Sequence, residues 1–550
     1  MPGTRKVSSI LTGLALLLQT SLPQLACSTK PPAVADRRCD ELADSPYDSQ
    51  KVGSGVPFAQ INISEALPVC EQAATRQPPR PRYQFIYGRV LEAANRYADA
   101  AQAYSLAEQA GYALAAVNLG RLYTMGRGVS QDFQHAARLY RQGADAGVSV
   151  AFYNLGQLYE TGQGVSQDWG EAAKWYQKAG DAGYADGYAA LSVLHAQSNP
   201  PHNAEAAKWA QKAAQGGSAF GSLLLGWHYL SGAGIEKDPV LAKRWYEEAA
   251  KQGLTDAMYR LGLMYRTGEG IPPDPGTAAQ WMYKAAEQGH HLAEAELGNM
   301  FYNGRGTKQD YGAAFAWYLR AAQGGIVRAQ NSVAALYELG QGVTKNDFDA
   351  VAWYRKAADQ GDVYAMDQMG MHLRLGKGVA WNEAEAMQWF RKAADKGYAP
   401  AESSLGYGYM HGLGGGLQDY RQSAYWLGKA AAQGDSYGQY NLAVLYGKGW
   451  GVDQDLGHAK ALFLQAAGSP VPELAKNARE MAMAIETPSH KTPDWVPVVA
   501  IGGGIAALAY LLSGPSSRDA KDSSLKTLEK VLGNDDYEKE ADRILKNTAR

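Results

Sequence analysis

The stretch Tyr153–Gly183 reads YNLGQLYETGQGVSQDWGEAAKWYQKAGDAG, and the same pattern returns along the chain from Ala113 to about Gly468. Each copy carries a Leu-Gly or Met-Gly pair, or a degenerate form of it, and successive pairs lie 36 residues apart almost throughout. The clear pairs begin at Leu119, Leu155, Leu225, Leu261, Leu297, Met369 and Leu405, and the degenerate ones at Leu191, Val333 and Leu442. A fixed period of this length predicts a solenoid of stacked helix–turn–helix units.

The first columns of the repeat predict a helix, a turn and a second helix. The Gly of the pair has no Cβ, so it lets a partner helix approach closely. A Gly-x-Gly motif such as Gly162/Gly164 ends the first helix at positive φ. The short polar residue after the turn is the predicted N-cap of the second helix. These predicted N-caps are Asp132, Asp168, Asp238, Asp274, Asp310, Asn346, Asn382, Asp419 and Asp455.

An aromatic column follows in the second helix, seven residues after most of the N-caps. It comprises Trp175, Trp209, Trp245, Trp281, Trp317, Trp353, Trp389 and Trp426. We expect these large rings to be the core anchors of the second helices. Small Ala pairs after them allow tight stacking, so every column of the repeat has a packing role.

This repeat resembles the Sel-1-like repeat, the 36-residue relative of the tetratricopeptide repeat. Ten copies over residues 113–468 cover about two thirds of the chain. The resemblance implies an all-α fold, a right-handed superhelical solenoid of antiparallel helix pairs whose concave face binds other molecules. Nothing in the family's repeat is catalytic, so the resemblance also implies that the protein is not an enzyme.

Composition and motifs exclude several classes of function. The chain has 53 Lys and Arg against 55 Asp and Glu, and no basic run dominates the repeats, which argues against nucleic acid as a partner. Three cysteines exclude a disulfide-dense scaffold, and no Cys/His cluster has the spacing of a metal site. The sequence shows no nucleophile–base pair and no cofactor motif. The Gly-x-Gly turns precede an Asp, which would repel a phosphate.

The N-terminus predicts export. Residues 1–27 have the pattern of a signal peptide, with a basic start, the apolar run Ile10–Leu18 and small residues around Cys27. Two processing routes stay open. Cleavage before Cys27 would allow lipid attachment there, although Gln24 stands where a lipobox normally carries an aliphatic residue. Ordinary cleavage after Ser28 would discard Cys27.

The segment before the repeats is divided into a tether, residues 28–60, and a cap resembling a tetratricopeptide hairpin, residues 61–112. The tether contains Cys39 and the cap contains Cys70. In an oxidising compartment these two cysteines are expected to form a disulfide, which would stabilise the fold by roughly 3–4 kcal/mol. The alternative is a pair of buried thiols.

The C-terminus predicts a membrane anchor. Residues 469–494 form a capping helix and a linker, and residues 495–513 contain WVPVVAIGGGIAALAYLL, with no charge until Arg518. This stretch gives about 25 Å of helix, slightly less than a bilayer core of about 30 Å. The other interpretation is a helix buried in the protein core. It is disfavoured because the C-terminal capping helix already covers the end of the solenoid, so no apolar core remains against which this helix could pack. The basic residues after the span place the tail, residues 514–550, in the cytoplasm and the repeats in the periplasm.

The expected function is that of a non-catalytic, membrane-anchored envelope scaffold or adaptor that binds other proteins, in an export or secretion assembly. An envelope sensor that signals to the cytoplasmic tail is the alternative. By analogy with tetratricopeptide arrays, the concave face is lined by first-helix residues near the Leu-Gly pair. The candidate residues for binding a protein, a peptide or a polysaccharide are Tyr153, Asn154, Gln157, Trp227, Tyr259, Arg260, Arg266, Asn299, Tyr302, Arg374, Tyr407 and Tyr440. A competing interpretation is that any solenoid must expose some side chains on its inner face.

Overall fold

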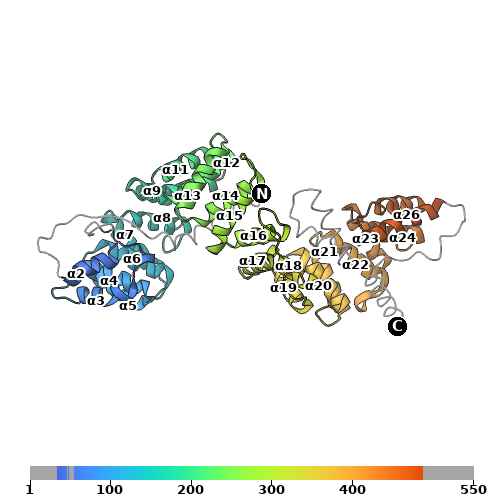
Figure 1. Ribbon diagram of the computed structural model, residues 1–550, viewed down its shortest axis with the longest axis horizontal. Helices are drawn as coiled ribbons and strands as arrows, with labels where there is room; N and C mark the ends of the chain where they lie inside the picture. Colours follow the sequence, from blue (N-terminus) through green and yellow to red (C-terminus); the bar gives the residue numbers. More distant parts are fainter. Residues whose placement is uncertain (1–33, 46–47, 49–54, 487–550) are drawn as a thin grey trace. The chain divides into compact units, whose positions relative to one another are not determined.

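A computed structural model describes residues 34–45, 48 and 55–486, and within these residues it contains helices and no strand (Figure 1). Two compact units divide the chain, residues 1–273 and residues 274–550, and the boundary falls between the two helices of the fifth repeat. The helices of the first unit are α2 (Val34–Ala43), η1 (Phe58–Gln60), α3 (Ile63–Ala74), α4 (Pro81–Ala93), α5 (Tyr97–Gln109), α6 (Ala113–Met125), α7 (Phe133–Asp145), α8 (Ser149–Thr161), α9 (Trp169–Asp181), α10 (Asp186–Gln197), α11 (Asn203–Gln215), α12 (Ala219–Ser231), α13 (Pro239–Lys251) and α14 (Thr255–Thr267).

The second unit continues the same alternation of first and second helices. Its helices are α15 (Pro275–Glu287), α16 (His291–Asn303), α17 (Tyr311–Gln323), α18 (Val327–Leu339), α19 (Asp347–Asp359), α20 (Val363–Leu375), α21 (Glu383–Ala394), α22 (Ala399–His411), η2 (Leu413–Gly415), α23 (Tyr420–Ala432), α24 (Ser436–Lys448), α25 (Leu456–Ala466) and α26 (Pro472–Glu486). Within each unit the two helices of a repeat pack on each other, and each second helix packs on the first helix of the next repeat. This arrangement is the predicted all-α repeat solenoid.

The turns inside the repeats have the predicted chemistry. All nine predicted N-cap residues accept a hydrogen bond from a backbone N–H in the first turn of the second helix. In the Gly-x-Gly turn of the second repeat, Gly162 and Gly164 both have φ of 71°. A Cβ on Gly164 would also lie 2.3 Å from the carbonyl oxygen of Phe133, at the start of the preceding second helix. The turn of each repeat therefore rests directly on the repeat before it.

The Gly of the Leu-Gly pair admits an aromatic ring from the second helix. A Cβ on Gly156 would lie 2.5 Å from a ring carbon of Tyr176, and one on Gly298 would lie 2.6 Å from a ring carbon of Tyr318. Both tyrosine rings are fully buried. The close helix approach predicted for this glycine is therefore confirmed.

The predicted Trp column is displaced from the core by one residue. Only Trp175, Trp389 and Trp426 are buried, and the other five rings are half-buried. The fully buried column comes one residue later and comprises Tyr140, Tyr176, Ala210, Tyr246, Met282, Tyr318, Tyr354, Phe390 and Leu427. Neighbouring helix positions point about 100° apart, so the later column faces the first helix most directly and the Trp column lies to one side of it.

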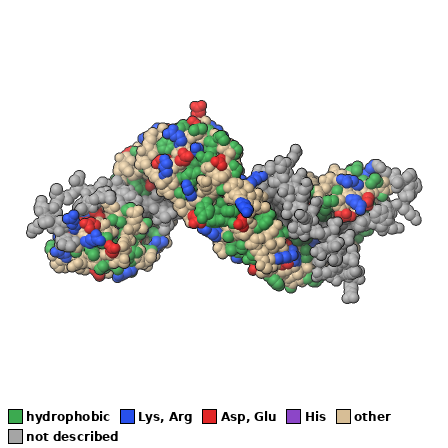
Figure 2. All heavy atoms as spheres, in the orientation of Figure 1, with side chains coloured by type: hydrophobic (Ala, Val, Ile, Leu, Met, Phe, Trp, Pro, Cys, Tyr) green, Lys and Arg blue, Asp and Glu red, His purple; other side chains and the backbone are tan. Residues whose placement is uncertain are grey.

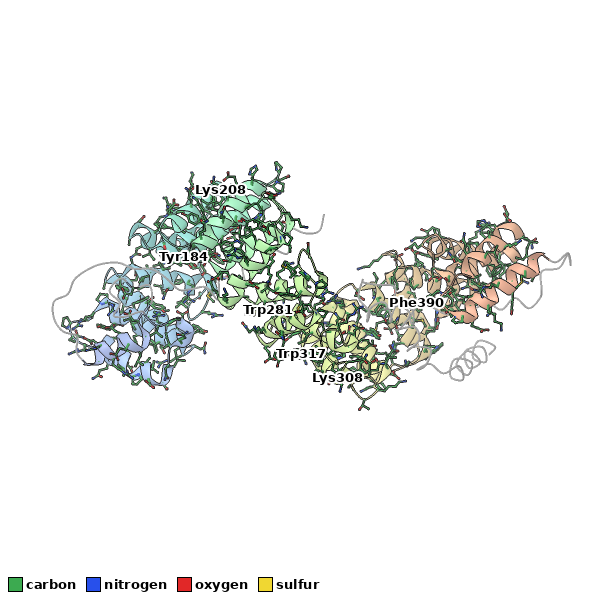
Figure 3. All side chains as sticks on the ribbon, turned by 45° about the horizontal axis from the view of Figure 1, so that its top comes forward. Tyr184, Lys208, Trp281, Lys308, Trp317 and Phe390 are labelled. Carbon is green, nitrogen blue, oxygen red and sulfur yellow. A yellow bond between two sulfur atoms is a disulfide. The ribbon has the colours of Figure 1, made fainter. Side chains whose placement is uncertain are left out.

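Rings of the Trp column pack at the side of the core: Trp175 and Trp209 stack on Phe152 and Tyr188 of the first helix in their own repeats, and others contact the neighbouring second helix. The ring of Trp317 on α17 lies 5.7 Å from that of Tyr283 on α15, and Figure 3 labels Trp317 and Trp281 on these two helices. A Lys or Arg three residues later covers most of the Trp rings, as Lys356 does with its Nζ 3.7 Å from the ring centroid of Trp353. Five of the eight rings therefore lie in a partly solvated seam, whereas Trp175, Trp389 and Trp426 remain buried.

The N-terminal segment is folded where a tether is predicted. Residues 34–43 form α2, and the predicted disulfide between Cys39 and Cys70 joins it to α3, with the two Cα atoms 4.9 Å apart. Four buried carboxyl groups follow one another at intervals of four residues, at Asp36, Asp40, Asp44 and Asp48. This acidic row supplies the second attachment of the segment.

Arginines of the first hairpin neutralise the acidic row. The Arg82 guanidinium donates to Asp40 and Asp48 at 2.7 Å and also to Asp44. Arg76 and Arg80 pair with Asp36 from the solvent side. The row therefore docks the segment on α4 through buried ion pairs.

The C-terminal cap is present, because α26 packs on α25 and α24. Within the described ranges, no helix combines the length and the apolar character that crossing a bilayer would require. The predicted signal peptide 1–27 with Cys27, the predicted transmembrane helix 495–513 and the predicted tail 514–550 lie outside the described residues.

Candidate partner-binding surface

The twelve candidate residues all lie on first helices. In the first unit they belong to α8, α12 and α14, and in the second unit to α16, α20, α22 and α24. First helices present one face to their own second helix and another to the first helices beside them. The exposure of each side chain therefore decides whether it can meet a partner.

Three candidates on neighbouring repeats of the first unit are exposed. The indole of Trp227 on α12 is 40% exposed although it follows directly on the buried Leu225-Gly226 pair. Arg260 and Arg266 on α14, the next first helix, are also exposed, and Tyr259 beside them is half-buried. Exposed Trp and Arg side chains on successive first helices are the residue types that contribute most to protein contacts.

The candidates on α8 are half-buried and take part in packing. The ring of Tyr153 lies 5.5 Å from that of Tyr176 and 5.2 Å from that of Tyr184, and burial raises the pKa of Tyr153. The side-chain amide of Gln157 donates to the Tyr153 hydroxyl at 3.4 Å, and Asn154 lies beside them. These residues stabilise the junction between repeats and leave only their edges accessible.

The candidates on α16 are also half-buried and paired. The side-chain carbonyl of Asn299 accepts a hydrogen bond from the Tyr318 hydroxyl at 2.7 Å. The Tyr302 hydroxyl donates to Gln341 at 3.1 Å. Both residues therefore have structural partners in the second unit.

Two candidates are corrected by their burial. Tyr440 is fully buried, with its ring 5.1 Å from that of Phe463, because α25 and α26 close over α24. Arg374 is buried and donates to Glu383 at 3.0 Å, and its guanidinium stacks on the ring of Phe390. Tyr407, which is half-buried, lies 5.9 Å from the same guanidinium. Tyr440 and Arg374 thus belong to the interior of the second unit.

One buried carboxyl group on α20 was not foreseen from the sequence. Asp367 is fully buried, and neither of its carboxyl oxygens has a hydrogen-bond partner among the described residues. Burial raises its pKa to about 7; the charge of Asp435 adds to this rise, and Arg374 opposes it. The only signal in the sequence is an acidic residue two positions before Met369, where the other repeats carry uncharged residues.

We predict that Asp367 makes the stability of the second unit pH-dependent. The pKa of about 7 in the folded state exceeds the ordinary value of 3.8, so the folded state binds more protons between these values and its stability falls as pH rises through that window. Above pH 7 the ionised group remains buried without a partner. Asp367→Asn removes the charge and should raise the free energy of unfolding at pH 8 by about 2–4 kcal/mol, with little change at pH 4.

Urea unfolding at both pH values, followed by hydrogen exchange in α20, measures this effect. Asp359→Asn is the matched control because Asp359 is exposed at the end of α19. An equal pH dependence for Asp367→Asn and the unchanged protein would contradict the prediction.

A second buried ionisable cluster on this part of the second unit, around Glu338, has its charges paired. Glu338 accepts hydrogen bonds from Lys377 at 2.7 Å and from the Tyr354 hydroxyl at 3.1 Å, and it lies 3.4 Å from a ring nitrogen of His372. Although burial opposes ionisation, these partners lower the pKa of Glu338 to about 2. The cluster ties the turn of one repeat to the preceding first helix. Across the described residues, no group of three or more His, Cys, Asp or Glu side chains is placed to hold a metal ion.

The fold and the exposed first-helix residues define an all-helical repeat solenoid of the class that binds proteins. A family model of the Sel1 repeat matches ten consecutive segments, and the chain belongs to the Sel1 repeat family. The matched segments are residues 113–148, 149–184, 186–218, 220–254, 255–290, 291–326, 327–362, 363–398, 399–435 and 436–468. The resemblance found in the sequence is therefore confirmed. Proteins of this family are generally non-enzymatic.

Solved structures of related repeat proteins align with the chain. A protective antigen of uropathogenic Escherichia coli with an SLR fold is 30% identical, and the alignment covers 78% of this chain and 97% of the antigen with a TM-score of 0.36. A Sel1 repeat protein from Oxalobacter formigenes is also 30% identical, with 56% and 89% covered and a TM-score of 0.45. No curated protein matches the chain.

Proposed function

We propose that the protein is a non-catalytic envelope scaffold that binds other proteins on the first-helix face of its solenoid. The observation that carries this proposal is the exposed indole of Trp227, together with the exposed Arg260 and Arg266 on the next first helix, in a chain with ten repeats of a protein-binding family. On the face shown in Figure 2, basic and acidic side chains are interspersed. This mixture suits a protein or peptide partner better than a nucleic acid.

Export and membrane anchoring form the second part of the proposal. The leader-like residues 1–27 support export, and the Cys39–Cys70 disulfide is of the kind that persists in oxidising compartments. The apolar stretch in residues 495–513, followed by basic residues, supports an anchor with the repeats in the periplasm and residues 514–550 in the cytoplasm. The scaffold would then hold its partners close to the membrane in an export or secretion assembly.

Affinity capture of the tagged full chain from solubilised membranes tests this function. We expect a reproducible set of protein partners that stays bound through washing in moderate salt. Recovery of the full chain in the soluble fraction would contradict the anchor. Capture of polysaccharide alone, or of no stable partner, would contradict the protein scaffold.

A further inference from the structure

The three most exposed large apolar side chains of the described residues lie in three consecutive repeats. Leu417 is 92% exposed, Phe348 is 74% exposed and Trp381 is 68% exposed. Phe348 belongs to the seventh repeat, Trp381 to the eighth and Leu417 to the ninth. Trp381 and Leu417 lie between the glycine turn and the second helix, and Phe348 lies in the first turn of its second helix, so the stacking of the repeats places the three along one edge.

Contacts between the turns show that this edge is continuous. A Cβ on Gly378, in the turn that carries Trp381, would lie 2.1 Å from the carbonyl oxygen of Asp347, which precedes Phe348. A Cβ on Gly414, in the turn that carries Leu417, would lie 3.3 Å from the carbonyl oxygen of Glu383, two residues after Trp381. We call the residues Phe348, Trp381 and Leu417 the apolar turn edge.

The apolar turn edge departs from the local rules of the repeat. Trp381 stands directly before an N-cap, where several other repeats carry a Gln whose side chain closes the turn. Gln167 and Gln454, for example, donate from this position to a backbone carbonyl of the first helix at 2.8 Å. Trp381 gives up that hydrogen bond and exposes its indole instead. Leu417 lies in the one turn that is a residue longer than the others. A sequence that breaks a local rule without a packing gain indicates a functional position.

The character of the apolar turn edge suits insertion into a lipid interface. Its side chains protrude; Trp is enriched at the membrane–water interface, and Trp, Phe and Leu are the residues that insert into it from an apolar face. The charges beside them in the sequence are mostly acidic, since Asp347 and Asp349 flank Phe348 and Glu383 follows Trp381. Electrostatic attraction to an anionic lipid surface is therefore not the main contribution to membrane affinity. The burial of the apolar side chains in the lipid interface provides that affinity instead.

We propose that the apolar turn edge docks on the bilayer that the C-terminal apolar stretch enters. This inference rests on the membrane anchoring in the proposed function. The described chain ends at Glu486 on α26, and residues 487–494 are the only link to the stretch that begins at Trp495. Eight extended residues span at most about 28 Å, so the last repeats stay close to the membrane surface. Docking the edge would fix which side of the second unit faces the lipid.

A fluorescent probe at position 417 tests the docking in the full chain. With Cys27→Ser as the background, Leu417→Cys is labelled with a nitrobenzoxadiazole group and the protein is reconstituted into phosphatidylcholine vesicles. We expect the emission to shift to shorter wavelength and to be quenched by nitroxide-labelled lipid. Ala432→Cys is the matched control, because Ala432 is exposed at the opposite end of α23 in the same repeat, and its probe should keep the emission seen in water.

The double change Phe348→Ser and Trp381→Ser supplies the second arm. It should abolish the spectral shift at position 417 and leave both the thermal melt and flotation with the vesicles unchanged, because both side chains are exposed. A full chain that floats with the vesicles while the probe at 417 stays in water would overturn the docking and leave the anchor intact. A chain that does not float would overturn the anchor, and the docking with it. A spectral shift that appears without lipid as protein concentration rises would assign the edge to contact between copies and overturn the proposal.

Discussion

Arg82→Met is expected to lower the free energy of unfolding of the N-terminal segment by about 3–5 kcal/mol, because it removes one partner from a buried ionic cluster. Three carboxyl groups, those of Asp40, Asp44 and Asp48, would lose their common counter-ion. The hydroxyl of Tyr112 would still donate to Asp48 at 2.6 Å, but a neutral donor does not compensate a buried charge. The Met side chain fills a volume similar to that of Arg, so the loss of stability reports the removal of the positive charge and its hydrogen bonds rather than a cavity.

The loss should shrink as pH falls. Burial already raises the pKa of Asp40, although Arg82 opposes this rise. Without Arg82 the carboxyl groups would take up protons in the folded state more readily than in the unfolded state, so the variant gains stability at lower pH.

Hydrogen exchange in α2 to α4 measures this prediction, since a long repeat array does not unfold as one unit. Arg76→Met is the matched control: Arg76 is half-exposed, and Arg80 keeps its own bond to Asp36 at 2.7 Å. The control should change the local stability by less than about 1 kcal/mol. Similar losses for both variants would contradict the central role of Arg82 in the acidic row.

Phe390→Ala is expected to lower the stability of the second unit by about 3–5 kcal/mol, as a large-to-small change in a filled core. Phe390 is fully buried, and a Cβ on Gly370 would lie 2.6 Å from its ring, so the helices cannot close much further over a cavity (Figure 3). The ring also carries the stacked guanidinium of Arg374. Loss of the ring leaves this buried cation with one contact fewer.

Trp353→Ala provides the comparison on α19 in the same unit. Trp353 is half-buried under Lys356, so its removal should cost only about 1–2 kcal/mol. Urea unfolding with hydrogen exchange in α18 to α22 distinguishes the two variants. A larger loss for Trp353→Ala would restore the Trp column to the core and reject the assignment of the buried column one residue later.

Much of the fold can be predicted from the sequence because the repeats carry the same kinds of helix-capping and turn residues at corresponding positions. Asp168 and Asn346 identify helix starts by their type and position, and Gly162 identifies a helix end, without any knowledge of distant contacts. The Trp column misleads because Trp is conspicuous and nearly invariant along the chain. The true core column varies between residues as different as Tyr246 and Ala210, so it has no clear pattern.

The candidate site is less predictable because exposure depends on neighbouring repeats. Tyr440 has the same position in its helix as the half-buried Tyr153, yet the C-terminal cap buries it completely. The four-residue spacing of the acidic row is visible in the sequence, but Arg82 lies 34 to 42 residues away from its partners. Asp367 becomes unusual only when its surroundings are known to supply no donor.

The central claim is that partners bind the first-helix face, and capture with Trp227→Ala tests it most directly. Trp227 is exposed beside a buried packing column, so its replacement should leave the thermal melt of the full chain nearly unchanged. The amount of partner captured from the same membranes should fall at least about tenfold. A fall of this size corresponds to a loss of about 1.4 kcal/mol or more of binding free energy, as expected at a binding hot spot. Undiminished capture by a variant of unchanged stability would contradict the account.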